Sequence, residues 1–140
     1  AEYLQQAWKE LGLNVKVQTV EWKSFTPQRR SGNYQIARDG WVMDYNDPSN
    51  ILELALTGNG NNNSKYSNPE FDGLMNKAAT EKDPQTRFGY LHQAEDLIMK
   101  DTAMVPLLYY NDFYLQSDKI TGSWHSADGF WHFEYADIAE

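Results

Sequence analysis

The chain has 140 residues, a length that suits one domain with one hydrophobic core. Its net charge of -8 argues against nucleic acid or an anionic membrane surface as a partner, because both require clustered Lys and Arg. The lack of cysteine excludes a disulfide scaffold and a thiol nucleophile, and no apolar run approaches the roughly 20 residues of a membrane span.

The first predicted element is an amphipathic helix over residues 1–11. Its apolar residues recur at helical spacing: Leu4, Ala7, Trp8 and Leu11. We interpret Trp8 as a core residue, and Gly12 stands where a C-terminal cap is expected. Because no N-cap residue precedes this helix, we expect the chain to begin within a larger unit.

A strand is predicted over residues 13–22. Its β-branched residues and incomplete polar alternation are typical of a strand covered on both faces of a parallel sheet. Trp22 stands at its end, and ligands of open α/β sheets bind beyond the carboxyl ends of strands. Trp22 is therefore either a wall of a binding site or a core residue.

A short helix is predicted from Lys23 to Gly32. Ser24 is the expected cap and Pro27 is expected in the first turn. Arg29 and Arg30 are adjacent and point in different directions, so at most one of them faces a given site.

A second strand, residues 34–42, leads into the most distinctive stretch of the chain. Arg38 is suited to a carboxylate and Asp44 to an ammonium group, so together they could hold a zwitterion. Gly40 allows close approach of a ligand to the backbone, and Pro48 ends the strand. In the alternative interpretation, Arg38 and Asp44 pair with each other or with neighbours, and Trp41 belongs to the core.

Helices dominate residues 48–101. A short one over Pro48–Leu56 is expected to be capped by Ser49 or Asn50, and a loop rich in Gly and Asn follows over 57–64. Asn68-Pro69 and Asp83-Pro84 each open a longer helix. The buried residues expected on these two helices are Phe71, Leu74, Met75, Ala78, Ala79, Phe88, Leu91, Ile98 and Met99.

A third strand is predicted over residues 103–116, with Pro106 placing it at an edge or at its beginning. The remaining residues are rich in aromatic side chains and are predicted to be irregular. His92 has no partner at i+4, and His125, Asp128 and His132 follow no metal-ligand spacing. We therefore expect neither a metal site nor a cofactor.

Several motifs occur in the order found in one protein family. They are Glu21–Lys23, Arg29–Tyr34, the stretch Arg38–Pro48, Tyr66–Asp72 and Val105–Tyr110. In these segments the chain resembles the family-5 bacterial solute-binding proteins, the oligopeptide-binding receptors of ABC importers. Such receptors are much longer, so the resemblance implies a fragment of one.

The resemblance implies an α/β fold, one lobe of a type II periplasmic-binding-protein fold with a mixed sheet flanked by helices. Residues 1–116 would form most of the C-terminal lobe. Residues 117–140 would return toward the missing N-terminal lobe. In isolation we expect this tail to be poorly packed or to pair with another molecule, as in a dimer.

The resemblance also assigns a role to individual residues. Asp44 would receive the α-ammonium group of a peptide, while Arg38 would serve the carboxylate of short peptides and Arg29 would lie near that end. The backbone at Gly40 and Trp41 would pair with the peptide as a strand does. The remaining expected ligand-binding residues are Trp22, Val42 and Tyr109, which would line the crevice.

The implied function is oligopeptide binding for uptake through an ABC permease, without catalysis, and with little specificity for side chains. The receptor would lie outside the cytoplasm, in a periplasm or on the cell surface as a lipoprotein. One alternative is a carbohydrate-binding or other small-solute-binding protein. Another is a hydrolase with a carboxylate pair, Asp44 with Asp47 or Glu53.

Overall fold

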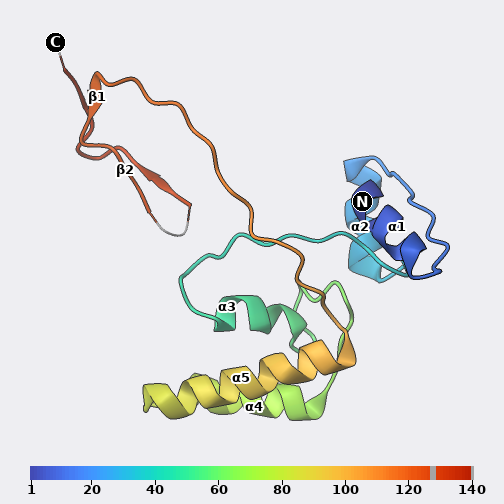
Figure 1. Ribbon diagram of the computed structural model, residues 1–140. Coiled ribbons are helices and arrows are strands. Elements are labelled where there is room, and N and C mark those ends of the chain that lie inside the picture. Colours follow the sequence, from blue (N-terminus) through green and yellow to red (C-terminus); the bar gives the residue numbers. More distant parts are fainter. Residues whose placement is uncertain (127–128, 140) are drawn as a thin grey trace.

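The computed structural model describes residues 1–126 and 129–139. Figure 1 shows two N-terminal helices, a helical unit built from α3, α4 and α5, and a C-terminal part of short strands. Long extended segments join these three parts. Among the described residues, no helix is long and apolar enough to cross a membrane.

The two N-terminal helices, α1 (Glu2–Glu10) and α2 (Trp22–Ser31), both end at a glycine. Gly12 and Gly32 have φ angles of 81° and 76°, in the left-handed region that favours glycine. Both helices were predicted, but the cap of α2 was not. The carboxylate of Glu21 accepts a hydrogen bond from the Lys23 N–H at 2.8 Å, so Ser24 is not the cap and Pro27 lies inside the helix.

The three predicted strands carry no ladder hydrogen bonds among the described residues. Residues 13–21, 34–42 and 103–116 form neither helix nor strand, and Trp22 already belongs to α2. A strand exists only through pairing with a neighbour. Here these segments find no partner strand, so their β-type sequence appears as unpaired, exposed backbone rather than as sheet.

The hydrophobic core lies in the helical unit, made of α3 (Ser49–Leu52), the 3-10 helix η1 (Glu53–Ala55), α4 (Pro69–Thr80) and α5 (Pro84–Asp101). Its buried residues are Leu52, Ala55, Phe71, Leu74, Met75, Ala78, Leu91, Ala94 and Ile98. The predicted core is largely confirmed. Ala79, Phe88 and Met99 are exposed because they lie outside the stripe where α4 and α5 face each other.

Side-chain caps explain where these helices begin. Asn68 accepts from the Glu70 N–H at 2.9 Å and Asp83 accepts from the Thr86 N–H at 2.8 Å, as predicted. The short helix α3 differs from the prediction. The Asp47 carboxylate accepts from the Ser49 N–H at 2.9 Å, so neither Ser49 nor Asn50 is the capping residue.

The C-terminal part contains two short antiparallel ladders where irregular structure was predicted. β1 (Ile120–Thr121) pairs with β4 (Asp137–Ile138), and β2 (Trp124–His125) pairs with β3 (Trp131–His132). The Trp124 and His132 rings stack across β2 and β3 with centroids 3.8 Å apart. At Gly122, a Cβ atom would lie 2.0 Å from the Tyr135 carbonyl oxygen, so only glycine fits there.

Candidate functional site

The distinctive stretch is extended up to Met43, bends over residues 44–47, and is attached to α3 at Trp41 and Asp44. The Trp41 indole N–H donates to Asn50 Oδ1 at 2.8 Å, and the Asp44 backbone N–H donates to the same oxygen at 3.3 Å. The Asn50 side chain is fully buried. A single amide oxygen therefore binds both the Trp41 side chain and the Asp44 backbone at the start of the bend, a role that the sequence did not reveal.

The end of the stretch is bound to α5 through an ion pair. Both Arg87 terminal nitrogens donate to the Asp47 carboxylate, each at 2.8 Å. These hydrogen bonds, with a further contribution from Ser49, hold the pKa of Asp47 well below its usual range. The Asp47 carboxylate is thus used to hold α3 and α5 together. This role argues against Asp47 as a member of the catalytic carboxylate pair in the hydrolase alternative.

Arg38 contacts a tyrosine 72 positions later in the chain. Its guanidinium donates to the Tyr110 hydroxyl oxygen at 2.6 Å and lies 6.0 Å from the ring centroid. The predicted Tyr109 is 98% exposed and makes no hydrogen bond among the described residues. Adjacent residues of an extended segment point to opposite faces, so Tyr109 faces away from the side on which Tyr110 contacts Arg38.

Arg29 is already paired with a carboxylate. It bonds to Asp39, which also accepts from the Asn63 side chain and from the Gly40 N–H, each at 2.8 Å. The Arg29 side chain is only 15% exposed and its Nε is buried without a partner among the described residues. Its guanidinium lies 6.0 Å from the ring of Trp22, which is itself 60% exposed.

Asp44 stands apart from these contacts. It is exposed, and its carboxylate takes part in no ion pair within residues 1–126 and 129–139. The interpretation in which Arg38 and Asp44 pair with each other is therefore wrong. Gly40 has open space on its Cβ side, and Val42 is exposed. The structure thus leaves a free carboxylate on a bend whose backbone is fixed.

The loop over residues 57–64 is held together by one buried asparagine. Asn62 Nδ2 donates to the carbonyl oxygens of Ala55, Leu56 and Tyr66, at 3.3, 3.0 and 2.8 Å. Its Oδ1 accepts from the Ser64 hydroxyl at 3.0 Å. Asn62 therefore uses its amide inside the loop, which weakens the case for sugar recognition by this asparagine-rich segment.

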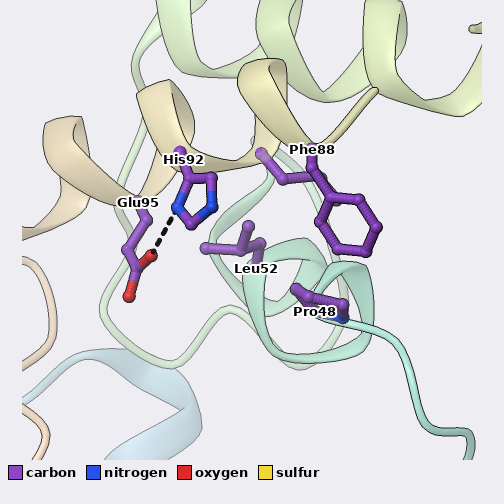
Figure 2. A pocket seen from close by; sticks show the side chains of 6 residues that line it. Pro48, Leu52, Phe88, His92 and Glu95 are labelled. Atoms are coloured by element: carbon purple, nitrogen blue, oxygen red, sulfur yellow. Dashed lines mark ion pairs between the residues drawn. The ribbon is translucent and has the colours of Figure 1, made fainter. Parts of the chain in front are cut away.

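A small apolar pocket lies between α3 and α5, away from the predicted site residues. Figure 2 shows Leu52, Pro48 and Phe88 along it, with His92 and Glu95 at one side. His92 Nδ1 lies 3.8 Å from the Glu95 carboxylate, and both side chains are exposed. No group of three metal-ligating side chains occurs among the described residues, and Asp128 lies outside them.

Comparisons with known proteins show which family has a similar sequence. Residues 1–63 match the middle region of the bacterial extracellular solute-binding proteins, family 5. The dipeptide-binding protein DppE of Bacillus subtilis is 34% identical over 138 residues, which is 98% of this chain and 25% of DppE. The chain belongs to the family-5 bacterial extracellular solute-binding proteins.

Further relatives place the chain within this family. The oligopeptide-binding protein OppA of B. subtilis is 37% identical over 87% of the chain and 23% of OppA. The structure of OppA from Burkholderia pseudomallei superposes with a TM-score of 0.73, at 39% identity, over 81% of this chain and 22% of that one. The chain spans about a quarter of the length of the curated relatives, and its fold is that of the corresponding part of a family-5 protein.

Proposed function

We propose that the chain is part of an extracytoplasmic receptor that binds short peptides and delivers them to an ABC permease, without catalysing a reaction. The names of DppE and OppA support peptides as the ligand class. The observation that carries the proposal is the exposed Asp44 carboxylate, which has no ion-pair partner among the described residues and whose backbone is held by Asn50. Such a group is suited to the α-ammonium of a peptide.

The other end of the ligand is assigned to Arg38. Its guanidinium already contacts the Tyr110 hydroxyl, and both side chains are accessible. An arginine and a phenol can together bind a carboxylate by charge-assisted hydrogen bonds. We therefore include Tyr110 in the site in place of Tyr109. The backbone of Gly40, Trp41 and Val42 lies between these two ends in sequence and would pair with the peptide backbone.

The structure changes the role that we propose for Arg29. Its charge is balanced by Asp39, and it is largely buried beside Trp22 and Phe25. A peptide carboxylate would have to displace Asp39 to reach it. We therefore propose that Arg29 fixes the shape of this wall of the site, together with Trp22, and that Arg38 provides the free positive charge.

This arrangement explains a preference for peptides as a class. The groups assigned here recognise features that every peptide has, its two termini and its backbone amides. Charge-assisted hydrogen bonds to termini are strong and independent of sequence. Side chains of the ligand can then occupy hydrated pockets, where bridging waters adapt to each residue. The proposed receptor therefore accepts peptides of many sequences, because its charged groups contact only the two termini.

We further propose that residues 1–116 belong to one lobe, and that the tail over 117–140 leads toward a second lobe that completes the site. A receptor of this kind acts outside the cytoplasm, either free in a periplasm or attached by a lipid anchor; the related OppA of Escherichia coli is named a periplasmic oligopeptide-binding protein. A single lobe leaves the ion pairs in water, where they contribute little. We therefore expect weak binding by this chain alone.

The test is a substitution of Asp44 in the full-length receptor that contains this chain. Asp44→Asn removes the negative charge and keeps the shape. We expect it to weaken binding of free tri-alanine by roughly 10- to 100-fold, the usual effect of losing a hydrogen bond to a charged group. Isothermal titration calorimetry would measure the dissociation constants of tri-alanine and of its N-acetylated form.

The acetylated peptide is the internal control. It lacks the ammonium group, so its affinity should change by less than about threefold in Asp44→Asn. An equal loss for both peptides would remove Asp44 from the amine-binding role and with it the proposed function.

A further inference from the structure

We propose that Asn50 is a positioning residue for the peptide site, and that its side-chain oxygen positions the Asp44 carboxylate by holding the Trp41 side chain and the Asp44 backbone where the chain begins to bend toward α3. The inference rests on the proposed role of Asp44. Asn50 does not touch the ligand in this proposal. It acts through the two groups that it binds, the indole N–H of Trp41 and the backbone N–H of Asp44.

The geometry favours positioning over simple packing. Asn50 Oδ1 accepts the Trp41 indole N–H at 2.8 Å and the Asp44 backbone N–H at 3.3 Å. Fixing that backbone N–H limits where the Cα of Asp44 can lie, and hence where its carboxylate can reach. The Asp44 side chain is exposed, and among the described residues its carboxylate takes part in no hydrogen bond or ion pair that would hold it in place.

Asn50 is in turn attached to the part of the molecule that contains the hydrophobic core. Its own backbone N–H donates to the Asp47 carbonyl oxygen at 3.0 Å. Asp47 is bound to Arg87 of α5 by two hydrogen bonds, and Leu52 of α3 is buried in the core that α5 helps to form. The position of the bend is therefore set by the helical unit, although Trp41 and Asp44 lie outside it.

The chemistry of the side chain supports the same role. Asn50 Nδ2 is buried and has no hydrogen-bond partner among the described residues, which is unfavourable for stability. An aspartate would accept both hydrogen bonds without this unpaired donor. It would also bury a negative charge at position 50, which is fully buried. Asparagine is the residue that provides the acceptor and leaves Asp44 as the only charge offered to an ammonium group.

The experiment compares four single variants and one double variant of the full-length receptor by calorimetry with tri-alanine and N-acetyl-tri-alanine. Asn50→Ala removes the shared acceptor, and Asp44→Asn removes the proposed amine-binding charge. Asn62→Ala is the matched control, since it also removes a buried asparagine oxygen that accepts hydrogen bonds, but within the 57–66 loop. Trp41→Phe removes only the indole donor.

We expect Asn50→Ala to lose at least fivefold more affinity for free tri-alanine than for the acetylated peptide. Asn62→Ala should change both affinities by the same factor. Trp41→Phe should show a smaller selective loss, and adding it to Asn50→Ala should cause no further loss, because both changes remove the same hydrogen bond. If Asn50→Ala does not fold, the selective loss in Trp41→Phe carries the test alone.

Two results would overturn the inference in different ways. If Asp44→Asn is selective for the free peptide but Asn50→Ala, or Trp41→Phe in its place, weakens both peptides equally, Asn50 is only structural and the proposed function stands. If Asp44→Asn itself shows no selectivity, the proposed function fails and the inference fails with it.

Discussion

Single residues connect the exposed bend to the core through a short series of hydrogen bonds. Asp47 is the central member, because its carboxylate caps α3 and receives both hydrogen bonds from Arg87. The Arg87 guanidinium, followed by Ser49, holds the pKa of Asp47 well below its usual range. Lowering a folded-state pKa below the unfolded value means that ionised Asp47 stabilises the folded chain.

The pH dependence of stability should report this ion pair. We expect Asp47→Asn to lower the free energy of unfolding at pH 7 by about 1–3 kcal/mol, the cost of leaving a hydrogen-bonding partner unpaired. The contribution of Asp47 is fully present above its unfolded pKa of about 3.9 and is lost as pH falls toward the folded value. Urea unfolding of both proteins at pH 7 and pH 2 would measure this difference.

Arg87→Gln serves as the control for this pair. It should reproduce the loss caused by Asp47→Asn, and the double variant should be less destabilised than the sum of the two, because they remove one interaction. A difference between Asp47→Asn and the parent that is as large at pH 2 as at pH 7 would show that the carboxylate charge is not responsible.

Among the elements, the helices follow from local signals in the sequence. Asn68-Pro69 and Asp83-Pro84 begin α4 and α5 as predicted, and the glycines after α1 and α2 end them. Each of these signals acts within one helical turn and needs no distant residue. The strands are different, because pairing depends on a neighbour that the same segment cannot provide. Predictions over 13–22, 34–42 and 103–116 therefore identified β-type sequence but not sheet.

Packing between α4 and α5 should account for most of the stability of the helical unit. We expect Ile98→Ala to lower the free energy of unfolding by about 2–5 kcal/mol, since Ile98 is completely buried and its truncation leaves a cavity. Met99→Ala, at the exposed neighbouring position of the same helix, should cost much less. Urea unfolding followed by circular dichroism would compare the two.

Similar losses in these two variants would contradict the arrangement of the helices. They would mean that the face of α5 carrying Ile98 is not the face packed against α4.

At the scale of the whole molecule, the extended segments without a partner strand leave large apolar side chains exposed. Residues 103–116 expose a run of large apolar side chains, among them Leu107, Leu108, Phe113 and Leu115. Soluble proteins seldom leave such a surface uncovered. Because the chain spans about a quarter of DppE and OppA, we propose that other parts of the full receptor cover these segments and complete their sheet.

Hydrogen exchange should distinguish the isolated chain from the full receptor. In the isolated chain, amides of α4 and α5 should exchange slowly, whereas those of residues 13–21, 34–42 and 103–116 should exchange at nearly unprotected rates. In the full receptor, the same three segments should become protected by strand pairing. Exchange measured by mass spectrometry gives both patterns, and unprotected segments in the full receptor would contradict the proposed lobe.

The residues of the candidate site could be predicted from the sequence only where they lie together in one motif. Arg38, Trp41 and Asp44 lie in a single stretch, so their spacing suggested a shared role. Tyr110 and Arg87 reach this stretch only through the tertiary fold, from 72 positions after Arg38 and 40 after Asp47. Asn50 is close in sequence but was considered only as a helix cap, because nothing local shows that its side chain points back to the bend.

The contact between Arg38 and Tyr110 also limits when this part of the candidate site can form during folding. Closing a free loop of 72 residues costs about 4 kcal/mol in chain entropy, if the cost grows as (3/2)RT ln n. One hydrogen bond returns only about 1 kcal/mol. The pair therefore cannot bring its own ends together and forms once the α4–α5 hairpin has shortened that loop. Assembly of the proposed carboxylate-binding end is a late consequence of folding, and not one of its causes.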